Sequence, residues 1–326
     1  MLTDITPWHW AGFTAFVLLA LALDLGVFHR NCRPTTFREA LGWTIVWSAS
    51  AFAFAFLVAP RTIVGWGPDH TATFVTGYLV ELSLSMDNVF VIALIFRYFA
   101  VPLEWQHRVL FWGILGALVL RGLMIGVGAL VIAQFHWVLY LMGAFLVYSG
   151  GKMFSAGDDQ QPLEPNNNPA VRLVRRFFPM SDHFDGEKLI THSAGRRLLT
   201  PLALVLVMVE TTDVVFALDS IPAIFGITND AFLVFTSNIF AILGLRSLYF
   251  VLASAMGCFR YLKYGLSLVL MFIGIKMLAE HWLKAWFGES MNHLSLAIVL
   301  GIILLSIGAS LLMAWLKPCR EDGAAR

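Results

Sequence analysis

The sequence predicts an all-α polytopic membrane protein with about nine transmembrane helices. Composition is the first reason, because 59% of the 326 residues are hydrophobic and 13% are charged, whereas soluble domains average about 25% charged residues. Apolar runs of about 20 residues, each long enough to cross a bilayer as a helix, recur along the whole chain. Lysine and arginine also gather in alternate loops, as they do in membrane proteins.

A single transmembrane domain is expected to cover residues 1–326, and each apolar run is taken as one span. The ranges are 8–28, 40–59, 73–97, 109–132, 137–154, 200–226, 231–256, 264–281 and 294–316. The first range is not expected to be a cleavable signal peptide. Asp4 stands where a basic segment would lie, and the apolar run is too long for such a peptide.

The basic residues set the expected orientation. With the loop 29–39 in the cytoplasm, seventeen of the 22 lysines and arginines fall in cytoplasmic segments, three lie on the outer side and two lie inside spans. This asymmetry predicts an outside N-terminus and an inside C-terminus. The three cysteines, Cys32, Cys258 and Cys319, then lie on the cytoplasmic side, where reduced thiols are expected.

The one long loop, about 155–199, is a predicted cytoplasmic linker. It begins with the turn-rich polar stretch "DDQQPLEPNNNP" and continues with "VRLVRRFFP". The second stretch fits either a basic amphipathic helix on the inner leaflet or a solvated basic loop. No soluble segment is large enough to hold an active site, so an enzyme is not expected. No nucleic-acid partner is expected, and the sequence does not specify protein partners.

Two acidic segments share one pattern. "ELSLSMDN" (81–88) and "DVVFALDS" (213–220) each read acid, five residues, Asp, then a small amide or hydroxyl residue. Arg121 and Lys152 follow the first copy, and Arg246 and Lys276 follow the second in the same order.

These matches predict two copies of a three-helix unit, at about 73–154 and 200–281. Because three is odd, the second copy would cross the bilayer inverted. Inverted repeats are typical of transporters, with the substrate site near the midplane where the copies meet. Spans 8–28, 40–59 and 294–316 would be additions outside the repeat.

The spans of the repeat carry five acids, which are Glu81, Asp87, Glu210, Asp213 and Asp219. An acid at the bilayer centre costs about 2.5–3.5 kcal/mol, so these side chains should face the bundle interior or a bound cation. Only Arg121 and Arg246 lie at comparable depth, as predicted counter-ions. Five acids against two arginines leave an excess of three negative charges, which protons, a metal cation or both must neutralise.

The spacing of the acids predicts a local break in their helices. Residues six apart, such as Glu81 and Asp87, differ by about 240° on a straight helix. For both to address one site, the helix should unwind between or beside them. Pro222 removes one backbone hydrogen bond after Asp219, and Ser83, Ser85 and Asn88 could replace such bonds around Asp87.

The available ligands favour a hard divalent cation such as Mg²⁺, Ca²⁺ or Mn²⁺, because they are carboxylate, amide, hydroxyl and carbonyl oxygens. Met86 and Met208 would add softer thioethers that favour Mn²⁺, although methionine is also ordinary in apolar helices. Asp24 and Asn238 are further candidates. The predicted metal-site residues are Glu81, Asp87, Asn88, Glu210, Asp213, Asp219 and Ser220.

At these residues the chain resembles the TerC family of integral membrane proteins, named for tellurium resistance and including Alx-type manganese exporters. The matching stretches are "LDLGVFHR" (23–30), "GYLVELSLSMDNVFV" (77–91), "ETTDVVFALDSIPAIFGIT" (210–228) and "SNIFAILGLRSLYF" (237–250). The resemblance implies a multi-pass protein of the bacterial inner membrane that lowers cytoplasmic Mn²⁺ by export. The family's intramembrane acids map onto the five acids of this chain without substitution.

Other functions stay open at this stage. A Ca²⁺ or broader divalent cation/proton antiporter fits the same ligands, and the bound cation would be substrate rather than a resident cofactor. Tellurite is an anion that an acid-lined path would repel, so any tellurite resistance would be indirect. An intramembrane aspartyl protease could use Asp87 and Asp219, but its GxGD motif is absent. The acids could also simply hold helices together by hydrogen bonds.

Overall fold

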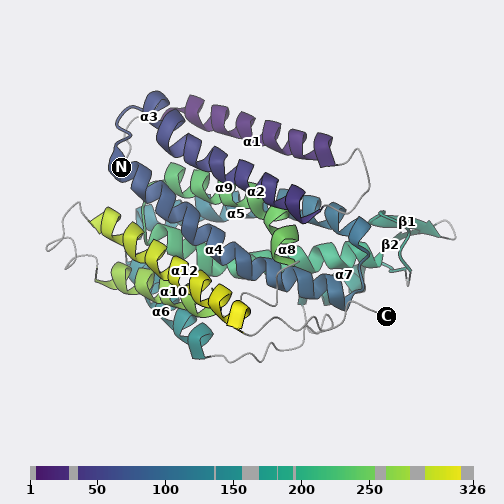
Figure 1. Cartoon of the computed structure of the whole chain (residues 1–326). Helices are drawn as coiled ribbons and strands as arrows, with labels where there is room; N and C mark the ends of the chain where they lie inside the picture. The colour runs from purple at the N-terminus through teal and green to yellow at the C-terminus, as the bar shows by residue number, and fades with distance from the viewer. Residues whose placement is uncertain are drawn as a thin grey trace.

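The computed structural model describes residues 5–28, 36–135, 137–155, 169–181, 183–193, 196–253, 262–279 and 291–316. Long helices form a bundle, and a small hairpin lies at one of its ends (Figure 1). The helices are α1 (Pro7–Phe28), α2 (Phe37–Ala53), the π-helical turn η1 (Phe54–Val58), α3 (Ala59–Thr62), α4 (Pro68–Tyr98), α5 (Leu103–Gln134), α6 (Val138–Ser155), α7 (Pro169–Phe177), α8 (Pro201–Phe225), α9 (Ala231–Ala253), α10 (Leu262–Leu278) and α12 (Met291–Leu316).

The polytopic, mainly helical architecture predicted from the sequence is confirmed. Each of the nine predicted ranges overlaps a helix, and seven helices within the described ranges are long and apolar enough to cross a membrane. The other two are α1, with a shorter apolar part at Pro7–Leu23, and α10, which has 17 residues. The exact number of crossings and their orientation stay predictions.

Several helices begin at side chains that satisfy free backbone N–H groups. Thr36 and Glu39 form a reciprocal capping box at the start of α2. Thr200 caps α8 by accepting from the Ala203 N–H, and Pro201 occupies the first helical turn. The Asp230 carboxylate accepts from the Phe232 and Leu233 N–H groups and so fixes the start of α9.

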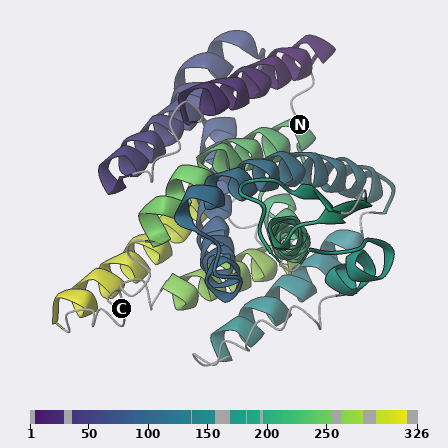
Figure 2. The same ribbon diagram turned by 90° about the vertical axis from the view of Figure 1, so that its right-hand side faces the viewer.

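The two most enclosed helices, α4 and α9, pack against each other at the centre. Figures 1 and 2 show α1 and α2 on one side of this pair, and α6, α10 and α12 on the other. A Cβ atom at Gly77 of α4 would lie 3.0 Å from the Ser237 Oγ of α9, so the helices approach closely. Small residues at such crossings let membrane helices pack backbone to backbone.

The helix contacts follow the order of the sequence repeat. Suppose that α4 is exchanged with α8, α5 with α9 and α6 with α10. The contact between α4 and α9 then becomes the contact between α5 and α8, which is also present. The contacts α4–α8, α5–α9 and α6–α10 map onto themselves. A pseudo-two-fold relation between the copies requires this pattern. Their inverted orientation stays a prediction.

The contacts between α6 and α10 show the same pseudo-two-fold relation at the level of single residues. A Cβ atom at Gly143 would lie 3.1 Å from the Gly274 carbonyl oxygen, and one at Gly150 would lie 2.8 Å from the Ser267 carbonyl oxygen. Gly143 and Ser267 are separated along the chain by the same number of residues as Gly150 and Gly274. The two backbones therefore touch at two equivalent points.

The predicted cytoplasmic linker contains structure that an all-helical prediction omits. Strands β1 (Ile190–Ser193) and β2 (Arg196–Leu199) pair antiparallel, with Ile190 opposite Leu199. These four-residue strands are too short to show an alternating pattern, so the sequence did not reveal them. Hydrogen bonds from Thr191 and Lys188 lower the pKa of the Asp185 carboxyl just before the hairpin.

Helix α7 corresponds to the helical alternative for "VRLVRRFFP". It packs on α8, and Val171 is fully buried there. Arg108 at the start of α5 lies 3.2 Å from the Glu187 carboxylate, so the loop between α4 and α5 and the hairpin region share one end of the bundle. The predicted topology also places these two segments on one side of the membrane, the cytoplasmic side. The turn-rich stretch 156–168 lies outside the described residues.

Candidate cation site

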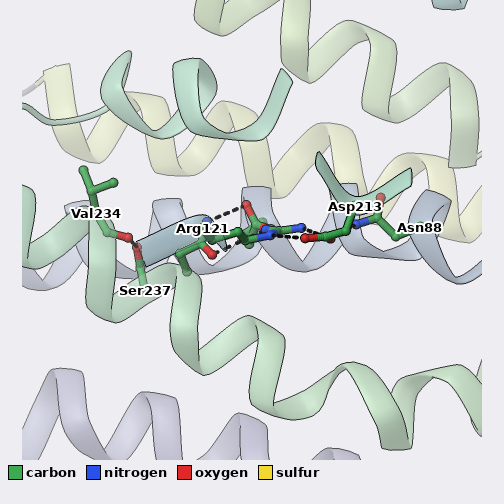
Figure 3. A network of polar contacts seen from close by, with 7 residues as sticks. Asn88, Arg121, Asp213, Val234 and Ser237 are labelled. Atoms are coloured by element: carbon green, nitrogen blue, oxygen red, sulfur yellow. Dashed lines mark hydrogen bonds and ion pairs between the residues drawn. The ribbon is translucent and has the colours of Figure 1, made fainter. Parts of the chain in front are cut away.

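A buried arginine connects the two acidic segments. Arg121 of α5 is 1% exposed and forms an ion pair with the fully buried Glu81 of α4. Its Nη2–H and Nε–H donate to the two carboxylate oxygens of Asp213 in α8, at 2.8 and 3.3 Å. Figure 3 shows Arg121 pointing at Asp213, with Asn88 on the far side of that carboxylate. Such two-pronged contacts are among the strongest hydrogen bonds of proteins.

Two asparagines complete this network from the helices around it. The Asn88 Nδ2–H of α4 donates to Asp213 Oδ1 at 3.3 Å. The Asn238 Nδ2–H of α9 donates to Glu81 Oε2 at 3.1 Å, and its Oδ1 accepts from Arg121 Nη1 at 3.4 Å. Each carboxylate therefore receives bonds from the arginine and from one amide. We call these five residues the Arg121 network.

The Arg121 network holds two carboxylates and one guanidinium. With all three ionised, it carries one net negative charge among residues that are at most 9% exposed. A buried charge without compensation is costly, so a cation or a proton would be bound favourably here.

A cavity of about 40 Å³ adjoins the network. A water molecule needs about 10–15 Å³ measured in this way, so the cavity has room for an ion or a few waters. Its apolar wall consists of Leu84, Met153, Phe216, Leu266 and Leu270, and its polar lining consists of Asn88, Arg121, Asp219 and Ser220.

Polar oxygens at this cavity lack hydrogen-bond partners in the described part of the chain. Asn88 Oδ1 and Ser220 Oγ are both buried without a partner. Asp219 Oδ1 accepts from the Ser149 hydroxyl of α6 at 2.9 Å. Because buried oxygens are almost always paired, unpaired ones at a cavity point to a missing ligand such as water or a cation.

Glu210 lies one helical turn before Asp213 and faces α5. A Cβ atom at Gly116 would overlap its carboxylate, so this acid fits there only because residue 116 is glycine. Its Oε2 is buried and has no hydrogen-bond partner among the described residues. Glu210 thus borders the Arg121 network as a further acid.

Arg246, the predicted counterpart of Arg121, is buried in α9. Its Nη2 lies 3.3 Å from Nδ1 of His107 in α5, and the His107 ring packs on Phe250 with centroids 4.4 Å apart. Sequence reasoning gave His107 no role, because it lies in the loop just before the predicted span 109–132.

Two of the predicted acids cannot be placed. The side chains of Asp24 in α1 and Asp87 in α4 lie outside the described part of the structure. Among the side chains that are described, no three His, Cys, Asp or Glu residues come close enough to hold a metal ion. A single site that combines Glu81, Asp87, Asp213 and Asp219 therefore stays a prediction.

The predicted unwinding of the two acidic helices is wrong. Helix α4 runs unbroken through 81–88, and α8 continues through Pro222 to Phe225. The hydroxyls of Ser83, Thr211 and Thr212 bond to carbonyl oxygens four residues earlier in their own helices, which leaves the backbone ladder intact.

The straight helices instead send their acids in different directions. Asp213 faces Arg121 of α5 and Asn88 of α4, whereas Asp219 faces Ser149 of α6. On this straight helix the side chains of Asp213 and Asp219, six residues apart, therefore point about 240° apart, as their spacing in the sequence implied.

Sequence reasoning missed the contribution of α6. Ser149 bonds Asp219, and Met153, one turn later, lines the cavity. A serine and a methionine in an apolar helix are too common to single out. Their spacing of four residues, which places them on one helix face, is the only signal that the sequence offered.

Comparison with known proteins agrees with this architecture. The model of the Integral membrane protein TerC family matches residues 66–318. The chain is 46% identical over 321 residues to "Uncharacterized membrane protein STKORF319" of Myxococcus xanthus, covering 98% of this chain and 97% of that protein. It is 43% identical over 304 residues to "Putative membrane-bound redox modulator Alx" of Escherichia coli strain K12, covering 91% of each.

A third relative, "Uncharacterized membrane protein" of Rickettsia bellii, is 36% identical over 303 residues, which cover 93% of this chain and 97% of that protein. No solved structure matches the chain. The family match spans the Arg121 network, the cavity and both acidic segments. The chain is thus a multi-pass membrane protein that belongs to the TerC family.

Proposed function

We propose that the protein is a divalent cation exporter of the bacterial inner membrane that moves Mn²⁺ out of the cytoplasm. One observation carries the proposal. Buried acids from two matching helices, Glu81 and Asp213, pair with Arg121, which lines a cavity where Asn88 Oδ1 and Ser220 Oγ have no partner among the described residues. This arrangement costs stability unless a cation uses it. The protein therefore acts as a transporter rather than as an enzyme.

The ligand types favour a hard cation. The cavity presents carboxylate, amide and hydroxyl oxygens from Asp219, Asn88 and Ser220, and Mg²⁺, Ca²⁺ and Mn²⁺ prefer such ligands. The Met153 thioether beside them is a softer donor, and it favours Mn²⁺ over the other two. A Ca²⁺ or broader divalent cation/proton antiporter remains the alternative.

Export of a divalent cation needs a second ion. Moving one elementary charge against the membrane potential costs about 2.3 kcal/mol per 100 mV, so a divalent ion costs about twice that. Protons entering the cell can supply this energy. The half-buried Glu210, next to the Arg121 network and with an unpaired oxygen, is a suitable proton carrier.

The helix arrangement supports transport. The main contacts between the α4–α6 copy and the α8–α10 copy are preserved when the two copies are exchanged, and the Arg121 network lies where the copies meet. Transporters built from inverted repeats hold their substrate at that interface and open it alternately to the two sides.

The name of the E. coli relative, a membrane-bound redox modulator, suggests a second candidate, a role in redox balance. Thiol chemistry is the usual basis of such a role, yet the cysteines of this chain fall at 32, 258 and 319, outside the described helices. Cation transport is favoured because it accounts for the buried acids. A change in cellular thiol redox state at constant metal content would favour the second candidate.

Transport by purified protein in proteoliposomes tests the proposal. Mn²⁺, Ca²⁺, Mg²⁺ and Zn²⁺ are offered in turn, with and without an opposing proton gradient. We expect Mn²⁺ transport that the proton gradient accelerates. Asp69→Asn serves as a matched control. Asp69 is also an acid of α4, but it lies at the start of that helix, away from the cavity, where it pairs with His293. Failure of all four cations to move would contradict the proposal.

A further inference from the structure

The Arg121 guanidinium already occupies the place of a cation. It pairs with Glu81 and uses Nε and Nη2 to hold both oxygens of Asp213. Asp213 Oδ1 also accepts from Asn88, so both of its lone pairs are used, and a metal ion bound at either Asp213 oxygen would lie next to the positive guanidinium and be repelled by it. Arg121 also lines the cavity itself, so the guanidinium and a bound cation would compete for one space.

We propose that Arg121 is a tethered counter-ion that the transported cation must displace from Asp213. This inference rests on the proposed function and deepens it. The same carboxylate would be bound by arginine in the empty protein and by the metal in the loaded protein. The described structure corresponds to the arginine-bound form.

The surroundings of Asp213 are arranged for such an exchange. Asn88 donates to Asp213 through Nδ2 and leaves its Oδ1 unpaired at the cavity. Asp219 and Ser220 line the same cavity. Once Arg121 withdraws, the Asp213 oxygens and Asn88 Oδ1 would bind the ion at the place where Arg121 borders this cavity.

Arg121 would still have two of its present partners after it withdraws from Asp213. Arg121 Nη1 already bonds Asn238 and pairs with Glu81. The guanidinium can therefore keep these two partners while it gives up Asp213, which avoids leaving a bare charge in the membrane.

The exchange explains how the empty protein could reset. Without a metal, the acids would repel each other, and their charge would oppose any movement through the low-dielectric membrane. Arg121 compensates part of that charge, so the empty protein can return to load another ion. Arg121 would accordingly be needed for net transport but not for exchange of one bound ion for another.

The alternative is a permanent brace, in which Arg121 holds α4, α5 and α8 together in every state. The two mechanisms differ in their effect on affinity. A competitor lowers the affinity for the cation, so its loss raises that affinity. A brace positions the ligands, so its loss lowers the affinity or unfolds the protein.

Mn²⁺ binding by isothermal titration separates the two, with wild type, Arg121→Gln and Arg121→Lys in lipid nanodiscs. We expect Arg121→Gln to bind Mn²⁺ roughly 10-fold more tightly, within the usual range of coupling between competing ligands. Arg121→Lys keeps the charge but cannot bond both oxygens of Asp213 while it pairs with Glu81. It should bind more tightly than wild type by a smaller factor.

Transport supplies an independent measurement. In proteoliposomes, Arg121→Gln should exchange internal for external Mn²⁺ while net Mn²⁺ efflux is lost, and Arg121→Lys, which keeps the charge, should retain part of the net efflux. Arg108→Gln is the matched control, because Arg108 belongs to the same helix but pairs with the half-exposed Glu187. Its affinity, exchange and net efflux should equal those of the wild type.

The outcomes are distinct. If wild type binds and moves Mn²⁺ but neither folded variant binds it more tightly, Arg121 is a brace and the inference is wrong, while the proposed function stands. If wild type neither binds nor exchanges Mn²⁺ or the other cations, the proposed function fails and takes this inference with it. If size-exclusion chromatography shows that Arg121→Gln does not fold, Arg121→Lys alone decides.

Discussion

Arg121 of α5 donates two hydrogen bonds to Asp213 of α8, at 2.8 and 3.3 Å. These residues are 92 positions apart in the sequence, and each belongs to a different copy of the predicted repeat. The contact therefore joins the two copies at the centre of the bundle. An arginine on one copy neutralises an acid on the other, and the site depends on both.

The proposed direction of transport predicts a cellular effect. Expression should lower cytoplasmic Mn²⁺ and protect cells from excess external Mn²⁺, because export removes the ion that enters. Total cell manganese measured by mass spectrometry checks this, with the Asp219→Asn variant as control. Unchanged or higher manganese on expression would count against export.

The acid at the cavity should be indispensable. Asp219→Asn keeps the shape but removes the charge, so transport should be abolished while the protein still inserts into the membrane. Ser149→Ala removes the hydroxyl that bonds Asp219 and should lower Mn²⁺ affinity about 10-fold, as loss of supporting groups at metal sites does. Proteoliposome transport and titration measure both effects, and wild-type values for both variants would remove Asp219 from the site.

Asp87 should behave like its counterpart in the second copy. Asp87→Asn is expected to abolish Mn²⁺ transport, because the sequence repeat pairs Asp87 with Asp219. The exposed Asp69 in the same helix provides the control, and Asp69→Asn should transport normally. If Asp87→Asn transports at the wild-type rate while Asp219→Asn does not, the two copies do not contribute equally to the site.

Gly116 offers a way to move Glu210 without changing it. In Gly116→Ala the new Cβ atom overlaps the Glu210 carboxylate, which must swing away. We expect slower proton-coupled Mn²⁺ transport with little change in thermal stability. Gly126→Ala is the matched control, because it lies in the same helix with no neighbour within 4 Å. Equal transport by the two variants would show that Glu210 is not on the proton path.

The α6–α10 contact should respond to a single methyl group. Gly150→Ala places a Cβ atom 2.8 Å from the Ser267 carbonyl oxygen and should cost roughly 1–3 kcal/mol through overpacking. Gly151→Ala has no neighbour within 4 Å and should be neutral or stabilising by up to about 1 kcal/mol. Thermal unfolding in detergent compares the two, and equal midpoints would refute the close contact.

The orientation can be mapped with single cysteines in a cysteine-free background. Pro102 and His183 are exposed at the end of the bundle that is predicted to be cytoplasmic. Cysteines there should react with a membrane-impermeant reagent only after the cells are opened. A cysteine at Val64, which is 72% exposed, should react in intact cells. The reverse pattern would invert the predicted topology.

The main helices and the central contact of the site could be predicted from the sequence. Apolar runs of about 20 residues located every long helix because lipid imposes that length. Because Arg121 and Arg246 are the only bases at comparable depth, both were predicted as counter-ions of the acids, and Arg121 pairs with two of them. The repeat related Glu81 to Asp213, and the structure places both against Arg121.

Other features depend on packing that the sequence does not encode locally. Nothing in α6 distinguishes Ser149 from other serines of apolar helices, so its bond to Asp219 could be found only in three dimensions. The unwinding expected beside Asp87 and Asp219 assumed that all acids face one point. The helices stay straight instead, since Asp213 and Asp219 have separate partners on α5 and α6.

The glycine contacts between α6 and α10 determine which parts can move together. At Gly143 and Gly274 the two backbones touch without a side chain between them, so one helix cannot slide past the other without steric overlap. Met153, which lines the cavity, and Ser149, which bonds the cavity residue Asp219, both lie on α6. If the cavity opens at α6, as the proposed transport would require, α6 and α10 must therefore move together as one rigid pair.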